Sequence, residues 1–374
     1  MRVLHVFKTY LPDNFAGIER VIWQIAESTA PLGIATDVLA LSARPEAAPF
    51  AVGQHRVHQA RLDLYLASTG ISLSLFGAFR RLLAEADLVH YHFPWPMMDL
   101  LHLSLARGKP AVVTYHSDIV RQQRLALLYR PLMDRFLRSV DAIVATSPDY
   151  VASSPVLARQ RPGQVSVIPI GIDDAIPAGT AERVTYWQQR LGGQRFFLFV
   201  GALRYYKGLE YLLEAARRSG LPVVIAGAGD PAIAHEASTL ANVTTLGAVD
   251  EADKHALLAL CTAFVFPSHL RSEAFGVALL EAARAGKPMI SSAMGTGTSF
   301  VNLDGVTGLT VPPGNAEQLA AAMTRLWHDP QLAADFGVQA RARYESVFTA
   351  AAMGAAYARL YRQVLLSRSL PREA

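Results

Sequence analysis

The sequence predicts an α/β protein of two doubly wound domains, and three observations support this prediction. The 374 residues exceed what one hydrophobic core usually holds, and they suit two domains of about 150–200 residues each. Hydrophobic residues make up 51% of the chain and charged residues 18%, which is typical of globular proteins with large buried sheets. Short apolar runs alternate with helical patterns in both halves of the chain, as they do in parallel sheets covered by helices.

The first half contains six apolar runs that are typical of buried parallel strands. They are residues 3–7, 35–41, 87–92, 111–116, 141–146 and 165–170. Helical patterns separate most of them, beginning with 17–33. We therefore expect a first domain over 1–172, with a linker-like stretch at 171–185.

The second half repeats the same order of elements. Strands are expected at 195–201, 222–229, 243–247, 262–268 and 288–292, with a helix at 208–220. These elements predict a second domain over 173–350. The tail has an amphipathic helical pattern over 351–368, and we expect a helix of about 351–374 to pack back on the first domain.

Composition excludes several classes of protein. The single cysteine, Cys261, rules out an internal disulfide and suits a reducing cytoplasm, and its apolar surroundings predict a packed core thiol. The N-terminus lacks the pattern of a signal peptide, and no run of about 18 uncharged apolar residues predicts a transmembrane helix. A cytoplasmic location is therefore expected.

A basic segment stands out at residues 121–138, although the formal net charge of the chain is only +4. This segment contains five arginines and one acidic residue, and its leucines recur near helical spacing. The pattern therefore predicts a basic amphipathic helix that is broken or kinked at Pro131. One interpretation is a solvated domain face. The other is a surface that lies on anionic lipid, which would place the protein peripherally on the inner face of the plasma membrane.

Ligands of open α/β sheets bind beyond the carboxyl ends of the strands, so the residues after each predicted strand are the candidates for a site. Gly17 begins a predicted helix after the first strand, where free backbone N–H groups suit a phosphate. Arg204 and Lys207 follow the strand at 195–201, and two cations in one such loop suit a diphosphate. The alternative for these cations is a solvated basic turn.

Two further motifs lie in the second half. Gly227 and Gly229 follow a strand but lack the third glycine of a dinucleotide fingerprint, so a tight turn near a ligand is the better interpretation. Residues 250–253 spell DEAD, yet the chain has no phosphate-binding loop of the P-loop type, which excludes a helicase. The same stretch predicts a helix start with acids near its positive end, where Asp250 and Lys254 could face a nucleotide base.

Histidines occur at the ends of two predicted strands. His116 directly follows the strand at 111–116 and is a candidate to contact a substrate, while His90 and His92 end the strand before it. No metal-ligand spacing accompanies them, and no D-x-D pair is present, so we expect no metal and no other cofactor. A serine hydrolase is excluded because the chain has no G-x-S-x-G motif.

The stretch RSEAFGVALLEAARAGKP, residues 271–288, holds Glu273 and Glu281 eight residues apart. Glu273 precedes the predicted helix, beside Phe275 and Gly276, and Glu281 lies inside it. This E-x7-E pattern, with FVFPSHLRS and GALRYYKG upstream, resembles the retaining glycosyltransferases of family 4. The likeness extends along nearly the whole chain and implies the GT-B fold, in which two Rossmann-like domains face each other across a cleft.

The resemblance implies a role for each matching position. Glu273 would contact hydroxyls of the donor sugar, backbone amides around Phe275, Gly276 and Val277 would meet the sugar or phosphate, and Glu281 would bind the ribose. Arg204 and Lys207 would stabilise the departing diphosphate. In the first domain, Gly17 would face that diphosphate and His116 would lie near the reacting face of the sugar. The family often has Gly-Gly in the first loop, where this chain has Ala16 and Gly17.

The fuller pattern HLRSEAFGVALLEAARAGKPMISSAMGTGTSFVN looks like that of bacterial mannosyl- or D-rhamnosyltransferases of O-antigen synthesis. This resemblance implies a GDP-sugar donor, a polyprenyl-diphosphate-linked saccharide acceptor and no nucleic acid partner. No carboxylate is placed by sequence to be a double-displacement nucleophile, which favours a front-face mechanism. The alternatives are a UDP-hexose-dependent transferase of family 4, a sugar-nucleotide 2-epimerase, and a non-catalytic module that binds sugar nucleotides.

Overall fold

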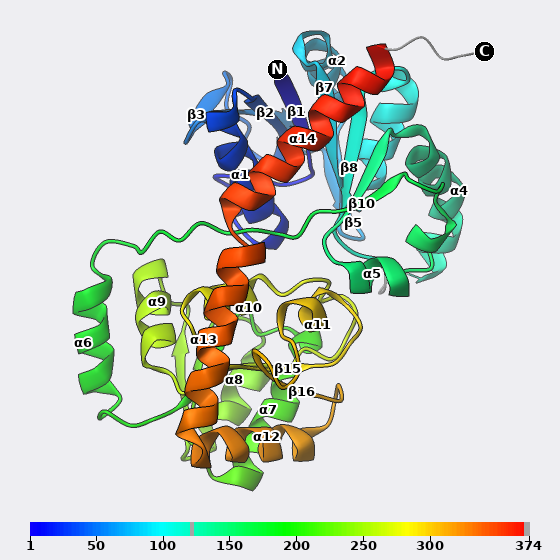
Figure 1. The fold of residues 1–374 in the computed structure, drawn as a ribbon. Coiled ribbons are helices and arrows are strands. Elements are labelled where there is room, and N and C mark those ends of the chain that lie inside the picture. Colours follow the sequence, from blue (N-terminus) through cyan, green and yellow to red (C-terminus); the bar gives the residue numbers. More distant parts are fainter. Residues whose placement is uncertain (120–122, 370–374) are drawn as a thin grey trace. The chain divides into compact units, whose positions relative to one another are not determined.

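A computed structural model of the chain describes residues 1–119 and 123–369, which form two compact units (Figure 1). Unit 1 comprises Met1–Asp173 together with the segment that begins at Ala350, and unit 2 comprises Asp174–Thr349. Each unit has its own parallel sheet and its own core, so each is described separately.

Unit 1 is built on an eight-stranded sheet with the order β10-β9-β8-β7-β1-β2-β4-β3. Neighbouring strands are parallel, except that β3 pairs antiparallel with β4. The strands are β1 Arg2–Val6, β2 Ala35–Ser42, β3 Phe50–Val52, β4 His55–Arg61, β7 Leu88–Phe93, β8 Ala111–Tyr115, β9 Ala142–Ala145 and β10 Val165–Val167. A separate antiparallel hairpin joins β5 Leu64–Leu66 to β6 Thr69–Ile71.

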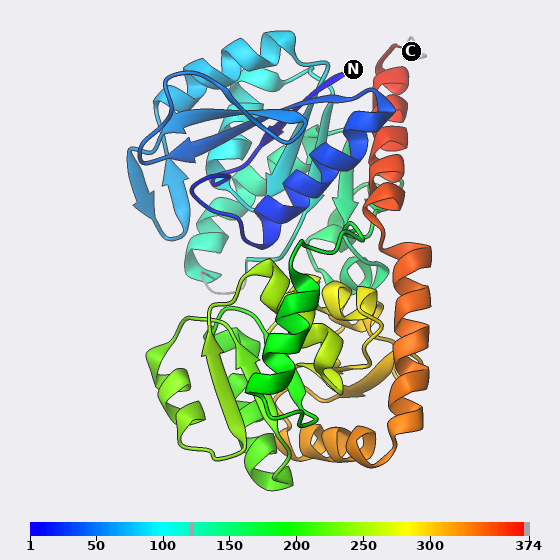
Figure 2. The same ribbon diagram turned by 90° about the vertical axis from the view of Figure 1, so that its left-hand side faces the viewer.

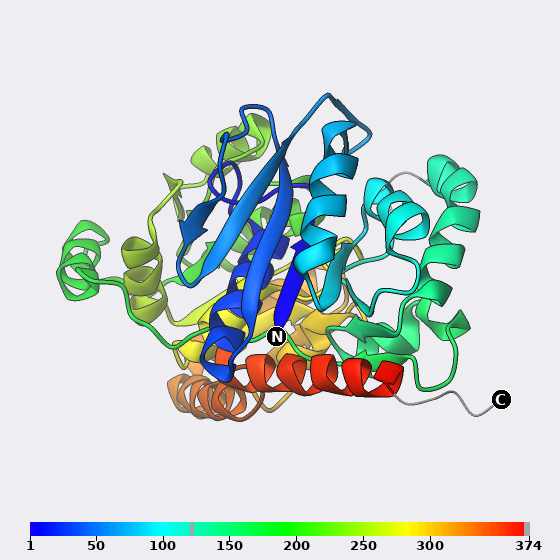
Figure 3. The same ribbon diagram turned by 90° about the horizontal axis from the view of Figure 1, so that it is seen from above.

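Helices cover both faces of this sheet (Figure 3). They are α1 Gly17–Thr29, α2 Ser74–Glu85, α3 Pro96–Leu101, α4 Gln123–Ser139, α5 Pro148–Ser153 and α14 Ala350–Ser369, with short turns η1 Ala30–Leu32, η2 His102–Ala106 and η3 Leu157–Arg159. The chain reaches α14 only after unit 2, yet α14 packs alongside α1 (Figure 2). The end of the chain thus supplies part of the cover of the first sheet.

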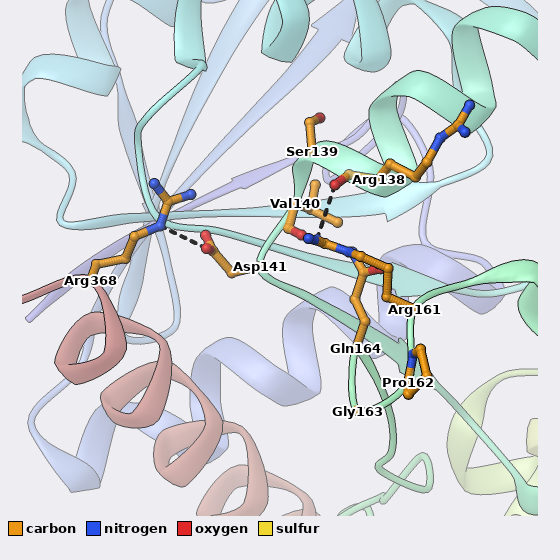
Figure 4. Close-up of a pocket in the computed structure, with 9 residues that line it drawn as sticks. All are labelled: Arg138, Ser139, Val140, Asp141, Arg161, Pro162, Gly163, Gln164 and Arg368. Atoms are coloured by element: carbon orange, nitrogen blue, oxygen red, sulfur yellow. Dashed lines mark hydrogen bonds and ion pairs between the residues drawn. The ribbon is translucent and has the colours of Figure 1, made fainter. Parts of the chain in front are cut away.

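Polar contacts also join α14 to unit 1. Arg368 donates from Nε to Asp141 over 2.7 Å, at a surface pocket that Arg138 and Arg161 also line (Figure 4). Arg161 donates to the backbone carbonyl of Arg138 over 3.0 Å. The three guanidinium groups do not converge on the pocket in Figure 4, so we interpret it as a joint between α14 and the β9 end of the sheet rather than as an anion site.

Unit 2 is built on a six-stranded sheet with the order β13-β12-β11-β14-β15-β16, in which all neighbouring strands are parallel. The strands are β11 Phe197–Val200, β12 Val223–Ala226, β13 Val243–Gly247, β14 Ala263–Phe266, β15 Met289–Ser292 and β16 Gly308–Val311. The helices are α6 Thr180–Arg190, α7 Leu209–Ser219, α8 Pro231–Ser238, α9 Glu251–Leu260, α10 Val277–Arg284, α11 Gly297–Val301, α12 Ala316–His328 and α13 Pro330–Val347, with the turn η4 Tyr205–Lys207.

The helices of unit 2 pack in pairs against the sheet. α7 contacts α12, α6 contacts α9, and α10 contacts α13. One hydrophobic cluster unites β11, β12, β14 and β15 with α7 and α12 through fully buried residues such as Phe197, Leu213 and Met323. Cys261 is buried, donates weakly to the carbonyl of Leu258, and has its pKa raised to about 12 by desolvation, so the predicted core thiol is confirmed.

The structure differs from the sequence prediction in several places. The strands β3, β4, β5, β6 and β16 were not predicted, and of these β3, β5 and β6 have only three residues each. The expected linker at 171–185 is partly helical, since α6 begins at Thr180. The helix is not broken at Pro131, because α4 runs through this residue and buries Met133, Phe136 and Leu137 beyond it, and the alternative of a kink there stays a prediction.

Among the residues that the structure describes, no helix has the length and apolar character needed to cross a lipid bilayer. The longest helix, α14, carries arginines at positions 359, 362 and 368.

Gly308 provides a test of how β15 and β16 pack. A Cβ at position 308 would lie 1.9 Å from the carbonyl oxygen of Met289, which is backbone that side-chain movement cannot relieve. We expect Gly308→Ala to lower the free energy of unfolding by at least about 2 kcal/mol in urea denaturation. Gly77→Ala is the matched control, because a Cβ on that α2 residue meets nothing within 4 Å. Equal stability of the two variants would contradict the strand packing.

Candidate active site

The sheet of unit 2 has a topological switch point between β11 and β14. After β11 the chain continues to β12 on one side, and after β14 it continues to β15 on the other side. Because all six strands are parallel, their carboxyl ends lie at one edge, and the two loops beside the switch point diverge and leave room for a ligand. Most of the predicted site residues of unit 2 lie in the loops or helix starts at this edge.

Lys207 and Glu273 meet at the switch point. Lys207 ends η4 after β11, Glu273 lies in the loop after β14, and their side chains form an ion pair. Each side chain is only 13% exposed. The Lys207 ammonium also lies 4.7 Å from the centre of the Phe266 ring, an attractive cation–π contact. The ammonium and the carboxylate are thus held together at the edge of the sheet, partly shielded from solvent, where a ligand could contact both.

Arg204 supplies a second cation to the same edge. It precedes η4 in extended backbone conformation, and its side chain is exposed. Arg204 and Lys207 therefore differ in setting: the ammonium is paired and partly buried, whereas the guanidinium extends into solvent. A multiply charged anion at the carboxyl ends of β11 and β14 would be attracted by both.

The loop that carries Glu273 is fixed by backbone contacts. Thr296 Oγ1 donates to the carbonyl oxygen of Glu273 over 3.1 Å, and the N–H of Gly297 donates to that of Ala274 over 2.8 Å. Gly297 is required there, since a Cβ would lie 2.5 Å from the ring of Phe275, which is buried. Loop 273–276 is therefore held against the start of α11.

α10 begins at Val277, directly after Gly276, whose φ of +84° is a conformation that glycine adopts without strain. The first turn of an α-helix has N–H groups with no partner inside the helix, and these suit an anion or a sugar oxygen. Phe275, two residues before this helix, is buried. The backbone groups predicted around Phe275, Gly276 and Val277 thus lie at the start of a helix beside Glu273.

Gly227 and Gly229 have a structural reason to be glycine. A Cβ on Gly227 would lie 1.9 Å from the carbonyl oxygen of Gly201, and one on Gly229 would lie 2.3 Å from that of Leu203. The turn after β12 therefore packs directly on the loop after β11. This contact helps to fix the backbone from which Arg204 and Lys207 extend.

Glu281 lies in the second turn of α10 and is paired with Lys254 of α9 over 2.6 Å. The Lys254 ammonium also bonds to Glu251, and the lysine is buried. The sequence predicts that Lys254 could face a nucleotide base, and this stays a prediction. The structure places its ammonium between the carboxylates of Glu251 and Glu281.

Asp250 caps α9, as its side chain accepts from the N–H of Asp253 over 2.7 Å. It also lies 3.9 Å from the guanidinium of Arg183 in α6. The predicted helix start with acids near its positive end is confirmed, since Glu251 and Asp253 occupy the first turn. The structure leaves the predicted contact between Asp250 and a base as a prediction.

In unit 1, Gly17 is the first residue of α1, is exposed, and would meet nothing within 4 Å if it carried a Cβ. Packing therefore does not require glycine at this position. The preceding loop is held over the helix start by Glu19, which is buried and accepts hydrogen bonds from Thr9 and Asn14.

His116 follows β8 and belongs to a cluster of buried histidines. His5 lies in β1, and His90 and His92 lie inside β7 rather than at its end. β1 and β7 are the strands on either side of the switch point of the first sheet. Burial lowers the pKa of His5 and of His116 to about 3 and places the pKa values of His90 and His92 well below the usual value. All four rings are therefore neutral at pH 7.

The ring nitrogens of His5, His90 and His92 lie within 4.8 Å of one another, a grouping that could hold a metal ion. Most of these nitrogens already have hydrogen-bond partners. His90 bonds to Thr114 and Tyr361, and His92 bonds to His5 and His116. A metal would displace these bonds, so the arrangement fits a hydrogen-bonded row of neutral rings better than a metal site.

Known proteins resemble this chain along its whole length. It is 55% identical to the "D-rhamnosyltransferase WbpZ" of Pseudomonas aeruginosa, over 94% of this chain and 93% of that protein. It is 48% identical to the "O-antigen chain mannosyltransferase C" of Escherichia coli, over 99% of this chain and 100% of that protein. Residues 15–176 match the family model described as Glycosyltransferase Family 4. The chain belongs to glycosyltransferase family 4.

Residues 187–343 of the transferase match a second family model, described as Glycosyl transferases group 1. Among solved structures, the sucrose-phosphate synthase of Thermosynechococcus elongatus superposes with a TM-score of 0.77, at 22% identity, over 98% of this chain and 99% of that chain. This likeness confirms the predicted GT-B fold of two Rossmann-like units. The chain is therefore a glycosyltransferase, as the resemblance of its motifs implied.

The structure brings together residues that are far apart in the sequence of the transferase. Lys207 meets Glu273, and Lys254 meets Glu281. Sequence reasoning missed the parts of Thr296 and His5. Thr296 lies in the stretch GTGTSFVN, but nothing in that stretch indicates that its hydroxyl holds the Glu273 loop. His5 could have been noticed, because a histidine in the middle of the apolar run VLHVF must find a polar partner inside the core.

The pairing of Lys254 with Glu281 predicts strong coupling in a double-mutant cycle. Lys254→Met removes the ammonium that lies 2.6 Å from the buried Glu281 carboxylate, so we expect the free energy of unfolding in urea to fall by about 2 kcal/mol. In the matched Lys254→Met/Glu281→Gln variant, most of this loss should be recovered, because the buried carboxylate is removed together with the ammonium. Strictly additive effects would show that the two side chains act independently.

The buried histidines predict a pH dependence of stability. An unfolded histidine has a pKa near 6.5, whereas burial lowers the pKa of His5 and His116 to about 3. The unfolded chain therefore binds more protons below pH 6.5, and stability falls as the pH is lowered from there. We expect each of these histidines to contribute a slope of up to about 1.4 kcal/mol per pH unit. Unfolding in urea between pH 7 and pH 5 measures it, and a flat profile would contradict the neutral, buried rings.

Proposed function

We propose that this transferase moves a mannosyl or D-rhamnosyl residue from a GDP-sugar to a lipid-linked saccharide during synthesis of a bacterial O-antigen or a related polysaccharide. The main support is the similarity to two proteins that carry the corresponding names, at 55% and 48% identity over nearly the full chain. The acceptor is proposed to be a saccharide on a polyprenyl diphosphate.

The donor is proposed to bind at the carboxyl edge of the sheet in unit 2. Its diphosphate lies beside Arg204 and Lys207, with the N–H groups at the start of α10 nearby. Hydroxyls of the sugar donate to Glu273, and the ribose hydroxyls donate to Glu281, which Lys254 holds in place. Asp250 remains a candidate to contact the base. From unit 1, Gly17 is proposed to face the diphosphate and His116 the sugar.

The proposed reaction breaks the bond between the anomeric carbon and the diphosphate while the acceptor hydroxyl attacks the same face. Negative charge grows on the leaving diphosphate, and fixed cations stabilise it without reorganisation at the moment of reaction. Arg204 and Lys207 take this part, so no metal ion is needed in the proposal. The proton of the acceptor hydroxyl passes to an oxygen of the leaving phosphate. His116 is uncharged at neutral pH and does not repel the positive charge that develops on the sugar.

A surface of unit 1 supports the proposal of a membrane-bound acceptor. α4 exposes Leu125, Leu127 and Leu128, and farther along it exposes Arg130 and Arg135. Neighbouring elements add exposed apolar side chains: β5 contributes Leu64, Tyr65 and Leu66, and α3 contributes Leu100. α3 contacts both α4 and β6, so these elements are adjacent. Apolar side chains flanked by arginines suit an anionic bilayer surface. Arg121 of the predicted basic segment lies outside the described residues.

A panel of GDP- and UDP-sugars tests the donor. We expect GDP-mannose or GDP-D-rhamnose to release GDP when a lipid-linked saccharide is present. Glu273→Gln should abolish transfer while the fold survives, and Lys207→Ala should lower kcat/KM on the order of 10²-fold, as loss of a charge stabiliser does. Thr185→Ala, an exposed residue of α6, is the control. Turnover of UDP-hexoses alone would refute the proposal of a GDP-sugar donor. Full activity of Glu273→Gln would refute the proposed role of Glu273 in the site.

The membrane surface predicts a loss of binding to anionic vesicles. We expect Arg130→Gln/Arg135→Gln to weaken sedimentation with phosphatidylglycerol vesicles by about tenfold or more, since each arginine near such a surface contributes about 1 kcal/mol. Leu128→Ser should weaken it as well. Leu366→Ser on α14 is the control, because this leucine is also exposed but belongs to another helix. Equal effects at positions 128 and 366 would contradict the proposed surface.

A further inference from the structure

Three of the buried histidines form a continuous hydrogen-bonded row. His5 Nδ1 lies 2.9 Å from His92 Nε2, and His92 Nδ1 lies 3.0 Å from His116 Nε2. The ring of His92 is nearly parallel to the rings of His5 and His116, with interplanar angles of 22° and 21°. The row begins inside the sheet, at β1, and ends at the carboxyl edge, at His116 after β8.

The N–H protons of the three rings can be arranged in only two ways. Each neutral imidazole carries a single N–H, and each of the two hydrogen bonds needs one N–H and one bare nitrogen. If His92 donates from Nδ1 to His116, its Nε2 is bare and must accept from His5. If His92 donates from Nε2 to His5, its Nδ1 must accept from His116. The protonation of all three rings is therefore coupled, and two arrangements exist.

The two arrangements differ at the ends of the row. In the first, the protons point toward His116, so His5 Nε2 is bare and His116 carries its proton on Nδ1. In the second, they point toward His5, so His5 carries its proton on Nε2 and His116 Nδ1 is bare. Among the described residues, no side chain or backbone group forms a hydrogen bond with His5 Nε2, which is completely buried.

The buried end of the row decides between them. A buried N–H without an acceptor is rarer in proteins than a buried acceptor without a donor. The first arrangement leaves only a bare nitrogen at His5 Nε2, whereas the second leaves an N–H there. The first arrangement is therefore the more stable one.

We propose that His5 and His92 are positioning residues that hold His116 in the tautomer with its proton on Nδ1, so that His116 offers a neutral N–H to the donor sugar. This inference rests on the proposed function for the placement of His116 beside the sugar. It assigns a part in catalysis to two core residues that contact no substrate.

A neutral N–H suits this position. The sugar develops positive charge as its bond to the diphosphate breaks, and an imidazolium would oppose that charge. A neutral ring with a proton on Nδ1 still donates to a sugar oxygen, whereas the other neutral tautomer would only accept at that nitrogen. The row thus fixes a donor without adding a charge.

The fourth histidine holds the row in place from the side. His90 lies beside both rings, with its centre 4.6 Å from that of His5 and 4.4 Å from that of His92. It bonds to Thr114 of β8 and to Tyr361 of α14, and Thr114 also bonds to Tyr357 of α14. The helix α14 therefore closes the histidine cluster, and His90 itself has no free nitrogen to join the row.

The tautomer can be measured without a substrate. In ¹⁵N-histidine-labelled protein, ¹⁵N–¹H correlation spectra distinguish a protonated ring nitrogen from a bare one. We expect His116 to be protonated on Nδ1 and His5 to be bare at Nε2. The opposite pattern would overturn the proposal. Changes in the signals of His5, His90 and His92 after treatment with EDTA or addition of zinc would also overturn it, in favour of a metal site.

Two variants at one position test whether the row sets the tautomer. His5→Asn places a side-chain amide near the position of Nδ1, where its NH2 group can take over the donation to His92, so we expect His116 to stay protonated on Nδ1. His5→Phe removes the donor and keeps the ring, so His116 should become a mixture of tautomers. An unchanged His116 spectrum in His5→Phe would overturn the proposal. Thermal unfolding of both variants identifies any effect that comes from stability alone.

Kinetics with the donor found in the panel complete the test. His5→Phe should lower kcat about tenfold, the effect of one misplaced hydrogen bond, with KM changed less than about threefold. His5→Asn should retain kcat within about threefold. A changed tautomer with unchanged kcat would overturn the part in catalysis. The expected spectra in a protein that transfers no sugar from any donor would confirm the row and refute the proposed function, so the two failures are distinguishable.

Discussion

Parallel strand pairing is the constraint on which the rest of this structure depends. In the sheet of unit 2 all strands run in one direction, so every loop that follows a strand emerges at the same edge, and in unit 1 only the edge strand β3 runs the other way. Lys207 and Glu273 are 66 residues apart in sequence, yet they form an ion pair because β11 and β14 are neighbours at the switch point. The chain between them builds β12 and β13 on one side of β11 and then returns to form β14 on the other side.

Charges in unit 2 are paired before any ligand binds. Glu273 and Glu281, which we propose to bind hydroxyls of the donor, each have a lysine partner. The lysine ammonium holds each carboxylate in one orientation at the edge of the sheet. The two acids therefore act as prearranged acceptors, and the cost of placing them in a half-buried site is met in the folding of the domain rather than in binding.

The buried histidines of unit 1 lie around the switch point of its sheet and are neutral. Burial keeps His5, His90, His92 and His116 neutral, and their ring nitrogens bond to one another, to Thr114 and to Tyr361 of α14. The last helix of the chain thus completes the polar interior of the first sheet. These hydrogen bonds attach α14 to unit 1 in addition to the packing of α14 on α1.

The sequence alone determined the α/β class, most strand positions and the glutamates before and inside α10, because buried runs and loop residues depend on local pattern. It also indicated family 4, through motifs that lie close together in the chain. Only the tertiary structure decided which polar side chains meet: Lys254 pairs with Glu281, and His5 bonds to His92. Which distant side chains meet depends on the order of the strands in the sheet, and the local sequence pattern does not indicate that order. For that reason α6, β4 and the histidine row were found in the structure and not in the sequence.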